Sequence, residues 1–309
     1  EFEGYDLVEE KLPTNAQGVM TKELIEVKYY YIKKANVRVE YIDKTYNQKL
    51  TEDVIINGHE NDSYTTEKKQ FDGYNLVEKP ENAEGTMKIT KNEDGTYNIE
   101  TVVTYYYKKQ AGGVTENHID IISKENLLTE KHEGNVGDSY NIPSREFEGY
   151  DLVEEENGKN MLPENAQGEM TEEEITVDYY YKRKAVVKVE YIDSQTEEKL
   201  YETQIDGHEK DKYKTEEKQF DQYDLIEIPS NAEGEMTKEE IVVKYYYIRK
   251  AEVEIQYVEK DTNAQLLPKA QIEGHVNDKY KTEPKEVEYY KLVGQTENTE
   301  GTMQIDKIT

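Results

Sequence analysis

Hydrophobic and polar residues alternate in short stretches along the chain, and this period of two is typical of β-strands with one buried face. In residues 241–247, Val243, Tyr245 and Tyr247 share one face, while Lys244 and Tyr246 lie on the other. Similar stretches begin at Ile25, Val37, Ile175, Val187 and Val253. Clear helical periodicity is scarce, so the sequence predicts a mainly β protein.

The alternating stretches belong to a set of motifs that recurs in one order. Gly-Tyr-x-Leu-Val is followed by Asn-Ala-x-Gly-x-Met and a tyrosine triplet, and Gly-x-x-x-Asp-x-Tyr lies upstream. A fixed period of this kind indicates one small domain per repeat. We predict the C-terminal half of a repeat at 1–34, repeats at 35–110, 111–184 and 185–250, and a C-terminally truncated repeat at 251–309.

The links between these repeats are short, which predicts an elongated rod of tandem modules. The link Gln110–Gly113 is longer and contains two glycines, so we expect the main bend there. Two repeats carry insertions, around Asp94-Gly95 and around Asn157-Gly158. Asp-Gly is a strong hairpin signal, and both insertions are expected at exposed tips.

The repeat at 111–184 departs from the others in its first strand. Glu116 stands where the preceding repeat has Val39, and His118 stands where it has Tyr41. A charged residue and an imidazole at core positions predict that this first strand is the weakest of the set.

Composition excludes several classes of function. The chain has 39 Lys and Arg against 68 Asp and Glu, a net charge of −29, which opposes binding to nucleic acid. There is no cysteine and no apolar run long enough for a membrane helix. Nucleophile elbows, phosphate loops and zinc-protease motifs are absent, so we expect no enzymatic activity and no cofactor. The 28 tyrosines favour a folded chain over a disordered one.

The middle residue of each tyrosine triplet is the candidate binding residue. Period two places it opposite the core face, where a tyrosine ring offers a flat surface for sugar C–H groups and a hydroxyl for hydrogen bonds. The alternative is that these rings pack on a second sheet face or on a neighbouring repeat. The four candidates are Tyr30, Tyr106, Tyr180 and Tyr246.

Two further sets of residues have structural interpretations. Tyr5, Tyr74, Tyr150, Tyr223 and Tyr290 are expected to anchor the core of each repeat. His59, His208 and His275 follow a glycine in three repeats, with no second His or Cys at ligand spacing. We interpret them as turn residues beside Asp62, Asp211 and Asp278, which are expected to cap the turn, and we expect no metal site; the acidic runs match no calcium loop.

The full motif order, with Val-x-Val-x-Tyr-Ile-Asp at the start of a repeat and Val-x-Tyr-Tyr-Tyr-x-Lys at its end, resembles the MucBP (mucin-binding protein) repeats of Gram-positive surface adhesins. The resemblance covers essentially the whole chain. It implies small β-grasp or ubiquitin-like modules, displayed in tandem on a bacterial cell surface and anchored to the cell wall by a signal outside this segment.

The resemblance also implies binding to host mucin glycoproteins or other glycans through repeated weak sites. Many weak sites on one chain gain strength by avidity. The alternative is a structural stalk that projects another domain from the cell wall. In either case we expect a monomeric rod without membrane insertion or nucleic-acid partners.

Overall fold

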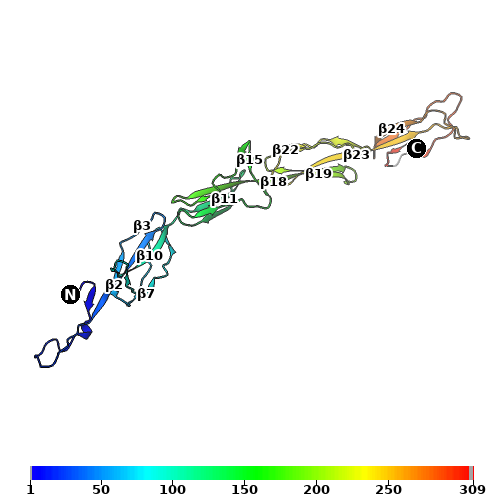
Figure 1. Cartoon of the computed structure of the whole chain (residues 1–309). Helices are drawn as coiled ribbons and strands as arrows, with labels where there is room; N and C mark the ends of the chain where they lie inside the picture. Colours follow the sequence, from blue (N-terminus) through cyan, green and yellow to red (C-terminus); the bar gives the residue numbers. More distant parts are fainter. Residues whose placement is uncertain (1, 306–308) are drawn as a thin grey trace. The chain divides into compact units, whose positions relative to one another are not determined.

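The structure is a computed structural model that describes residues 2–305 and residue 309 (Figure 1). Its regular structure is almost entirely β, which confirms the predicted fold class. The helical segments among the described residues are two short 3-10 turns, η1 (Glu9–Lys11) and η2 (Glu297–Thr299). In this part of the chain no helix is long and apolar enough to cross a membrane. The narrower β-grasp assignment stays a prediction.

The chain forms two compact units. The first comprises Glu1–Ile119, Asn126–Arg145 and Glu155–Tyr179, and the second comprises Asp120–Glu125, Glu146–Glu154 and Tyr180–Thr309. Strand β18 (Ile175–Asp193) contributes residues to both.

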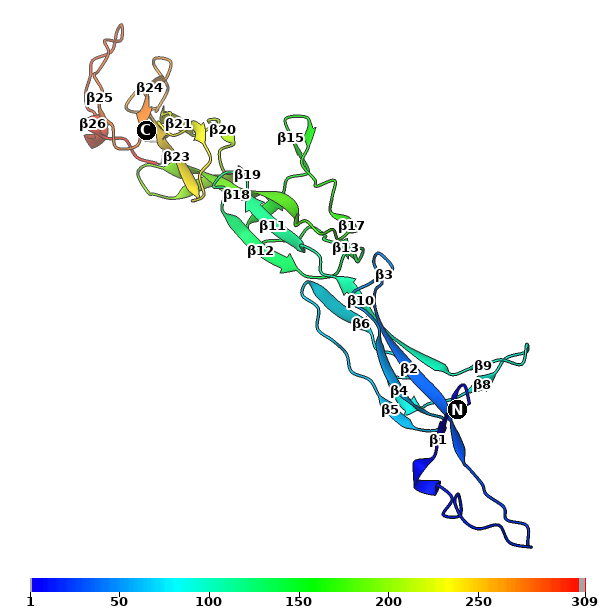
Figure 2. The ribbon, with the colours of Figure 1, turned by 90° about the vertical axis from the view of Figure 1, so that its left-hand side faces the viewer.

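A parallel pair of strands forms the centre of the first unit's main sheet, namely β2 (Tyr31–Asp43) and β10 (Glu100–Lys109). They lie side by side in Figure 2, with Val39 opposite Val103 and Tyr41 opposite Tyr105. Antiparallel strands flank this pair: β1 (Tyr5–Leu7), β3 (Gln48–Lys49) and β4 (Val54–His59) on β2, and β6 (Tyr74–Glu78) on β10.

The core of residues 35–110 consists of alternating side chains of β2 and β10. Tyr41 stacks on Tyr105 with ring centroids 5.6 Å apart, and the edge of Phe71 meets Tyr107 at 5.1 Å. A buried phenol needs a hydrogen-bond partner, and each of these tyrosines donates to a backbone carbonyl. The acceptors are Glu67 for Tyr41, Thr66 for Tyr105 and Lys69 for Tyr107.

The second unit repeats this architecture. Strand β18 pairs in parallel with β23 (Ile241–Ile255), and antiparallel strands β19 (Lys199–His208) and β21 (Tyr223–Glu227) flank them. Tyr191 stacks on Tyr245 at 5.3 Å, as Tyr41 does on Tyr105. The same sheet also contains β14 (Tyr150–Leu152), which pairs with β18, and β24 (Ala270–His275), which pairs with β23.

Two-stranded ladders explain the Asn-Ala-x-Gly-x-Met motif. Beside the first ladder, the Tyr64 hydroxyl donates to the Asn82 carbonyl at 3.1 Å. Met87 packs closely on Gly58, where an added Cβ would lie 2.9 Å from the Met87 side chain. These ladders are β5–β7 (Ser63–Thr65, Glu84–Thr86), β13–β17 (Ser139–Asn141, Gln167–Glu169), β20–β22 (Lys212–Lys214, Glu233–Glu235) and β25–β26 (Lys279–Lys281, Glu300–Thr302).

Both insertions form hairpins, which was predicted for the one at Asp94-Gly95. Strands β8 (Thr90–Lys91) and β9 (Tyr97–Asn98) enclose Asp94-Gly95, and β15 (Glu155–Glu156) and β16 (Lys159–Asn160) enclose Asn157-Gly158. Each hairpin projects from its sheet in Figure 2. The first strand of the 111–184 repeat, β11 (Val114–Asp120), is complete and pairs with β12 (Asn126–His132).

One expectation is wrong for the first segment. The alternation in residues 25–31 predicts a buried face, but Ile25, Val27 and Tyr29 are all exposed, and β2 begins only at Tyr31. In the complete repeats, the triplet strand pairs with a parallel first strand, as β10 does with β2. The described residues 2–34 contain no counterpart of that strand, so no parallel strand covers this face.

Candidate functional site

The middle tyrosines of the complete triplets lie on the sheet face opposite the core. Tyr105 and Tyr107 are 1% and 2% exposed, while Tyr106 between them is only partly buried. Tyr180 and Tyr246 are partly buried in the same way, and the tyrosines on either side of each are buried. Tyr30 is 50% exposed in the segment without a covered face. In the triplets of the other three repeats, the strand period therefore presents one ring to the outer face, whereas Tyr29 and Tyr31 are exposed beside Tyr30.

An aliphatic side chain and a carboxylate accompany two of these rings. Tyr106 lies opposite Ile42 on β2 and opposite Glu78 on β6. Lys44 places its Nζ 5.4 Å from the Tyr106 ring centroid and 2.9 Å from a Glu78 carboxylate oxygen. Tyr246 has the equivalent neighbours, Ile192 on β18 and Glu227 on β21. An aromatic ring beside a carboxylate can stack on a sugar and accept its hydroxyl protons.

A register shift lies beside each of these two tyrosines. The β10–β6 pairing shifts between Tyr106 and Tyr107, and the β23–β21 pairing shifts between Leu225 and Glu227. Bulges of this kind re-aim a side chain at a sheet edge. The sequence gives no clear signal for them.

Ion pairs lie on the same outer face in residues 35–110. The Arg38 guanidinium contacts Glu100 at 2.9 Å and also pairs with Glu40, and Lys49 contacts Asp53 at 2.7 Å. The hydrogen bond from Lys49 lowers the pKa of Asp53. Such pairs hold their partners in place, and the ring of Tyr106 lies on the same face with the Lys44 ammonium over it.

The tyrosines expected to anchor the core behave in two ways. Tyr74 and Tyr223 pack against the core clusters, and the hydroxyls of Tyr74, Tyr150 and Tyr223 lie 3.3–3.4 Å from the buried carboxylates of Asp43, Asp120 and Asp193. Tyr5 and Tyr290 are 37% and 50% exposed, so the expectation is wrong for these two. Both lie in the incomplete repeats, where less of the sheet covers them.

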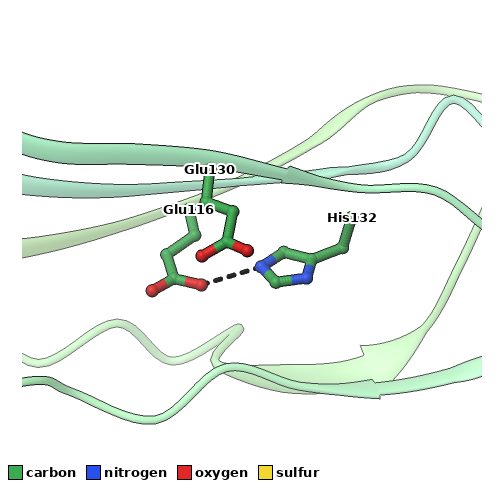
Figure 3. A group of neighbouring side chains, drawn as sticks. All are labelled: Glu116, Glu130 and His132. Carbon is green, nitrogen blue, oxygen red and sulfur yellow. Dashed lines mark hydrogen bonds and ion pairs between the residues drawn. The ribbon is translucent and has the colours of Figure 1, made fainter.

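A charged cluster replaces part of the core in the 111–184 repeat. Glu116 and His118 are 1% and 0% exposed, and His118 stacks on Tyr179 at 5.5 Å, in the place of the Tyr41–Tyr105 pair. The Glu116 carboxylate lies 2.8 Å from His132 Nε2, as Figure 3 shows. It also lies 2.7 Å from His118 Nε2 and 2.6 Å from Arg145 Nε. The substitutions at residues 116 and 118 signal this cluster in the sequence, but the partners His132 and Arg145 do not.

An arginine side chain already pairs with the carboxylates that a metal ion would need. Glu116, Glu130 and His132 could each offer one ligand atom to a metal ion, with all three atoms within 4.8 Å of one another. The Arg145 guanidinium, however, bridges Glu116 and Glu130 with contacts of 2.6 Å to each. Burial raises the pKa of the Glu116 carboxyl, but hydrogen bonds from His118, His132 and Arg145 outweigh burial and lower it from 4.5 to about 2. The arrangement is a buried ion-pair network.

The histidines interpreted as turn residues make a second contact. Asp62 Oδ2 accepts the backbone N–H of His59 at 2.8 Å, which is the predicted turn. His59 Nε2 also lies 3.1 Å from Asp6 Oδ2, in the preceding repeat. The sequence analysis missed this contact, because no local spacing connects residues that far apart.

Five segments of the chain match one protein family. Residues 1–32, 36–108, 113–182, 186–248 and 252–309 match the MucBP domain. Internalin J of Listeria monocytogenes serotype 4b (strain F2365) is 33% identical over 290 residues, which is 90% of this chain and 30% of that protein. Internalin I of Listeria monocytogenes serovar 1/2a (strain ATCC BAA-679 / EGD-e) is 28% identical over 179 residues, 57% of this chain and 9% of that protein.

Two solved structures share low sequence identity with the chain. The Bacillus anthracis TIE protein is 12% identical, with a TM-score of 0.32 over 93% of this chain and 74% of that one. A type 2 repeat of the mucus binding protein MUB from Lactobacillus reuteri is 16% identical, with a TM-score of 0.15 over 48% and 99%. The chain spans about 30% of the Internalin J that it matches. Because the five family matches account for most of its residues, the chain belongs to the MucBP domain family.

Proposed function

We propose that this chain is a non-catalytic repeat region of a bacterial surface adhesin that binds host mucin or other glycans. The observation that carries the proposal is the outer-face tyrosine, which each complete triplet presents beside a buried core: Tyr106, Tyr180 and Tyr246. Tyr30 is the fourth member of the set. Membership of the MucBP family supports the choice of mucin as ligand.

The charges around these rings favour neutral sugar units. Glu227 lies beside Tyr246, Glu78 lies beside Tyr106 in an ion pair with Lys44, and the chain carries a net charge of −29. Carboxylates accept hydrogen bonds from sugar hydroxyls and repel sialic acid or sulfate. The proposed contact is therefore a ring stacked on a neutral hexose, with the hydroxyls donated to the adjacent carboxylate.

Each such contact is weak, and repetition supplies the affinity. One exposed ring contributes little by itself, whereas several rings on one chain raise the effective concentration of sites. We propose that the repeats at 1–34, 35–110, 111–184, 185–250 and 251–309 act as separate modules of a monomeric array. The parent protein is then extracellular and held at the cell surface.

Binding to immobilised mucin, intact and enzymatically deglycosylated, tests this proposal. We expect binding to intact mucin only. Added salt should leave this binding unchanged or strengthen it. Salt screens the repulsion between the acidic chain and the sialic acid or sulfate groups that mucin carries beside its neutral sugars. Binding that collapses steeply in moderate salt would contradict this mechanism, since it would indicate attraction between opposite charges.

The second candidate function is a structural stalk that projects another domain from the cell wall. The observation that favours it is the continuous strand between repeats: β2 and β23 each run from a tyrosine triplet into the first strand of the next repeat. Absence of binding at high density of intact mucin would support the stalk and contradict the adhesin.

A further inference from the structure

The same contact occurs between three pairs of consecutive repeats. His59, His208 and His275 place Nε2 at 3.0–3.1 Å from an Asp carboxylate of the preceding repeat, namely Asp6, Asp151 and Asp224. A lysine from the end of the preceding triplet strand contacts the other oxygen of the same carboxylate at 3.0–3.2 Å. These lysines are Lys34, Lys184 and Lys250. Each of these three junctions therefore contains a Lys–Asp–His triad.

The junction between the 35–110 and 111–184 repeats has an uncharged counterpart of this triad. Gln110 stands in the place of the lysine, Asn75 in that of the aspartate and Asn135 in that of the histidine. The hydrogen bonds are retained: Gln110 Nε2 donates to Asn75 Oδ1 at 3.0 Å, and Asn75 Nδ2 donates to Asn135 Oδ1 at 2.9 Å. All three positions change together, so the contact itself is what the chain preserves.

We propose that this triad is the docking surface between consecutive modules, in a charged Lys–Asp–His form and a neutral Gln–Asn–Asn form. The partner that it fits is the neighbouring module of the same chain. Each half is incomplete alone, because the lysine and aspartate come from one module and the histidine from the next.

The geometry makes the charged form sensitive to pH. Counted along the chain, the third junction joins the repeats at 111–184 and 185–250. There His208 Nε2 faces Asp151, and its Nδ1 lies 3.5 Å from Asp211 Oδ2. An imidazolium offers an N–H to both carboxylates, whereas neutral imidazole leaves one nitrogen lone pair facing a negative oxygen. The other charged groups there are Lys184, on Asp151, and the Arg183–Glu209 pair at 3.7 Å. Docking should therefore be tighter with a protonated imidazole than with a neutral one.

Two further observations agree with this inference. Hydrogen bonds from Lys184 and then His208 lower the pKa of Asp151, so its carboxylate stays charged when the imidazole gains a proton. The neutral junction also coincides with a break in the strand: β10 ends at Lys109 and β11 begins at Val114, whereas β18 runs unbroken through residues 183–185.

The absence of cysteine allows a direct test in the full chain. Two introduced cysteines are then the only sites that thiol-reactive dyes can label. One variant carries Glu148→Cys and Lys212→Cys across the third junction. Its matched control carries Asp72→Cys and Ser139→Cys at the corresponding exposed positions across the second junction, which is the neutral one between the repeats at 35–110 and 111–184. Time-resolved energy transfer then reports the distribution of distances across each junction.

We expect the distribution at the third junction to be narrower at about pH 5.5 than at about pH 8, and that at the second to be unchanged. The ratio of docked to undocked module should change about two- to five-fold, the size expected for an exposed ion pair. Lys184→Gln with Asp151→Asn and His208→Asn should remove this dependence on pH. The reverse exchange, Gln110→Lys with Asn75→Asp and Asn135→His, should create it at the second junction.

Asp151→Ala should broaden the distribution at both pH values, because it removes the central group of the triad. All substituted side chains lie at the surface, and circular dichroism checks that the modules stay folded. An unchanged distribution in Asp151→Ala would overturn the docking role. Equal widths at both pH values in the unsubstituted third junction would overturn the charged form of the proposal.

Discussion

The cores of the repeats at 35–110 and 111–184 solve one packing problem in two ways. In the first, Val39 and Tyr41 fill the inner face of β2; in the second, Glu116 and His118 occupy these places on β11 and are equally buried. The ring stack survives the exchange, since His118 lies on Tyr179 as Tyr41 lies on Tyr105. What allows the exchange is a set of partners for the carboxylate: His118, His132 and Arg145.

The comparison separates what a module needs from what it retains. The core tolerates a change from hydrophobic to ionic, provided that every charge is paired. The outer-face tyrosine is present in both repeats, as Tyr106 and Tyr180. The buried tyrosines on either side of it, Tyr179 and Tyr181, are retained as well, so the exchange is confined to the first strand.

The largest expected effect comes from placing the charge without its partners. Val39→Glu puts a carboxylate at the position of Glu116 in a core that has no arginine or histidine there. We expect a loss of about 3–5 kcal/mol in the stability of residues 35–110, because the buried charge is uncompensated. Hydrogen exchange of the β2 and β10 amides measures this locally, with the amides of β23 as the internal control. Undiminished protection in β10 would show that the module does not need the partners.

A smaller effect is expected from the opposite exchange. Glu116→Val with His118→Tyr rebuilds the hydrophobic core in the 111–184 repeat. Replacement of a buried ion pair by packed hydrophobic residues is often neutral or stabilising by about 1–4 kcal/mol. We expect hydrogen exchange in β11 and β12 to slow or stay constant. Glu116→Val alone is the matched control, and it should be less stable than the double variant. Strong destabilisation of the double variant would mean that the ionic core does more than fill space.

Acid should distinguish the two cores further. The pKa of Glu116 is lowered from 4.5 to about 2, so its contribution to stability is complete above about pH 4.5 and is lost as pH falls toward 2. Pepsin cleavage in residues 114–132 should therefore rise over this range more than cleavage in residues 37–59. In the Glu116→Val, His118→Tyr variant this difference should disappear. Equal acid sensitivity of both repeats would contradict the assignment.

Sequence alone predicted most of the fold, because its signals are local. Period two in residues 241–247 and the Asp94-Gly95 turn determine strands and hairpins without reference to distant residues. It failed at Ile25 and Val27, where the same pattern lacks a covering strand.

The parts of the site that the sequence analysis missed depend on contacts between distant residues. The partners of Glu116 come from β12 and from the loop at Arg145, and the Asp of each junction lies 51 to 57 residues from its His. The mid-triplet tyrosines follow from alternation, but the Ile and Glu beside Tyr106 and Tyr246 depend on the sheet register. Local pattern gives the face of a residue, and only the fold gives its neighbours.

The central claim is that the mid-triplet tyrosines bind glycan. The direct measurement compares mucin binding by the chain with Tyr30, Tyr106, Tyr180 and Tyr246 changed to Ser, and by a control with four exposed tyrosines outside the triplets changed to Ser. The control set is Tyr46, Tyr97, Tyr201 and Tyr289. Both variants should stay folded by circular dichroism, since surface substitutions cost about 0.5 kcal/mol or less each and half-buried ones somewhat more.

We expect glycan-dependent binding to be lost in the mid-triplet variant and kept in the control, because the mid-triplet rings recur on the outer face from repeat to repeat and the control rings do not. Equal binding by the two folded variants would contradict the account, and it would leave these tyrosines with a packing role alone.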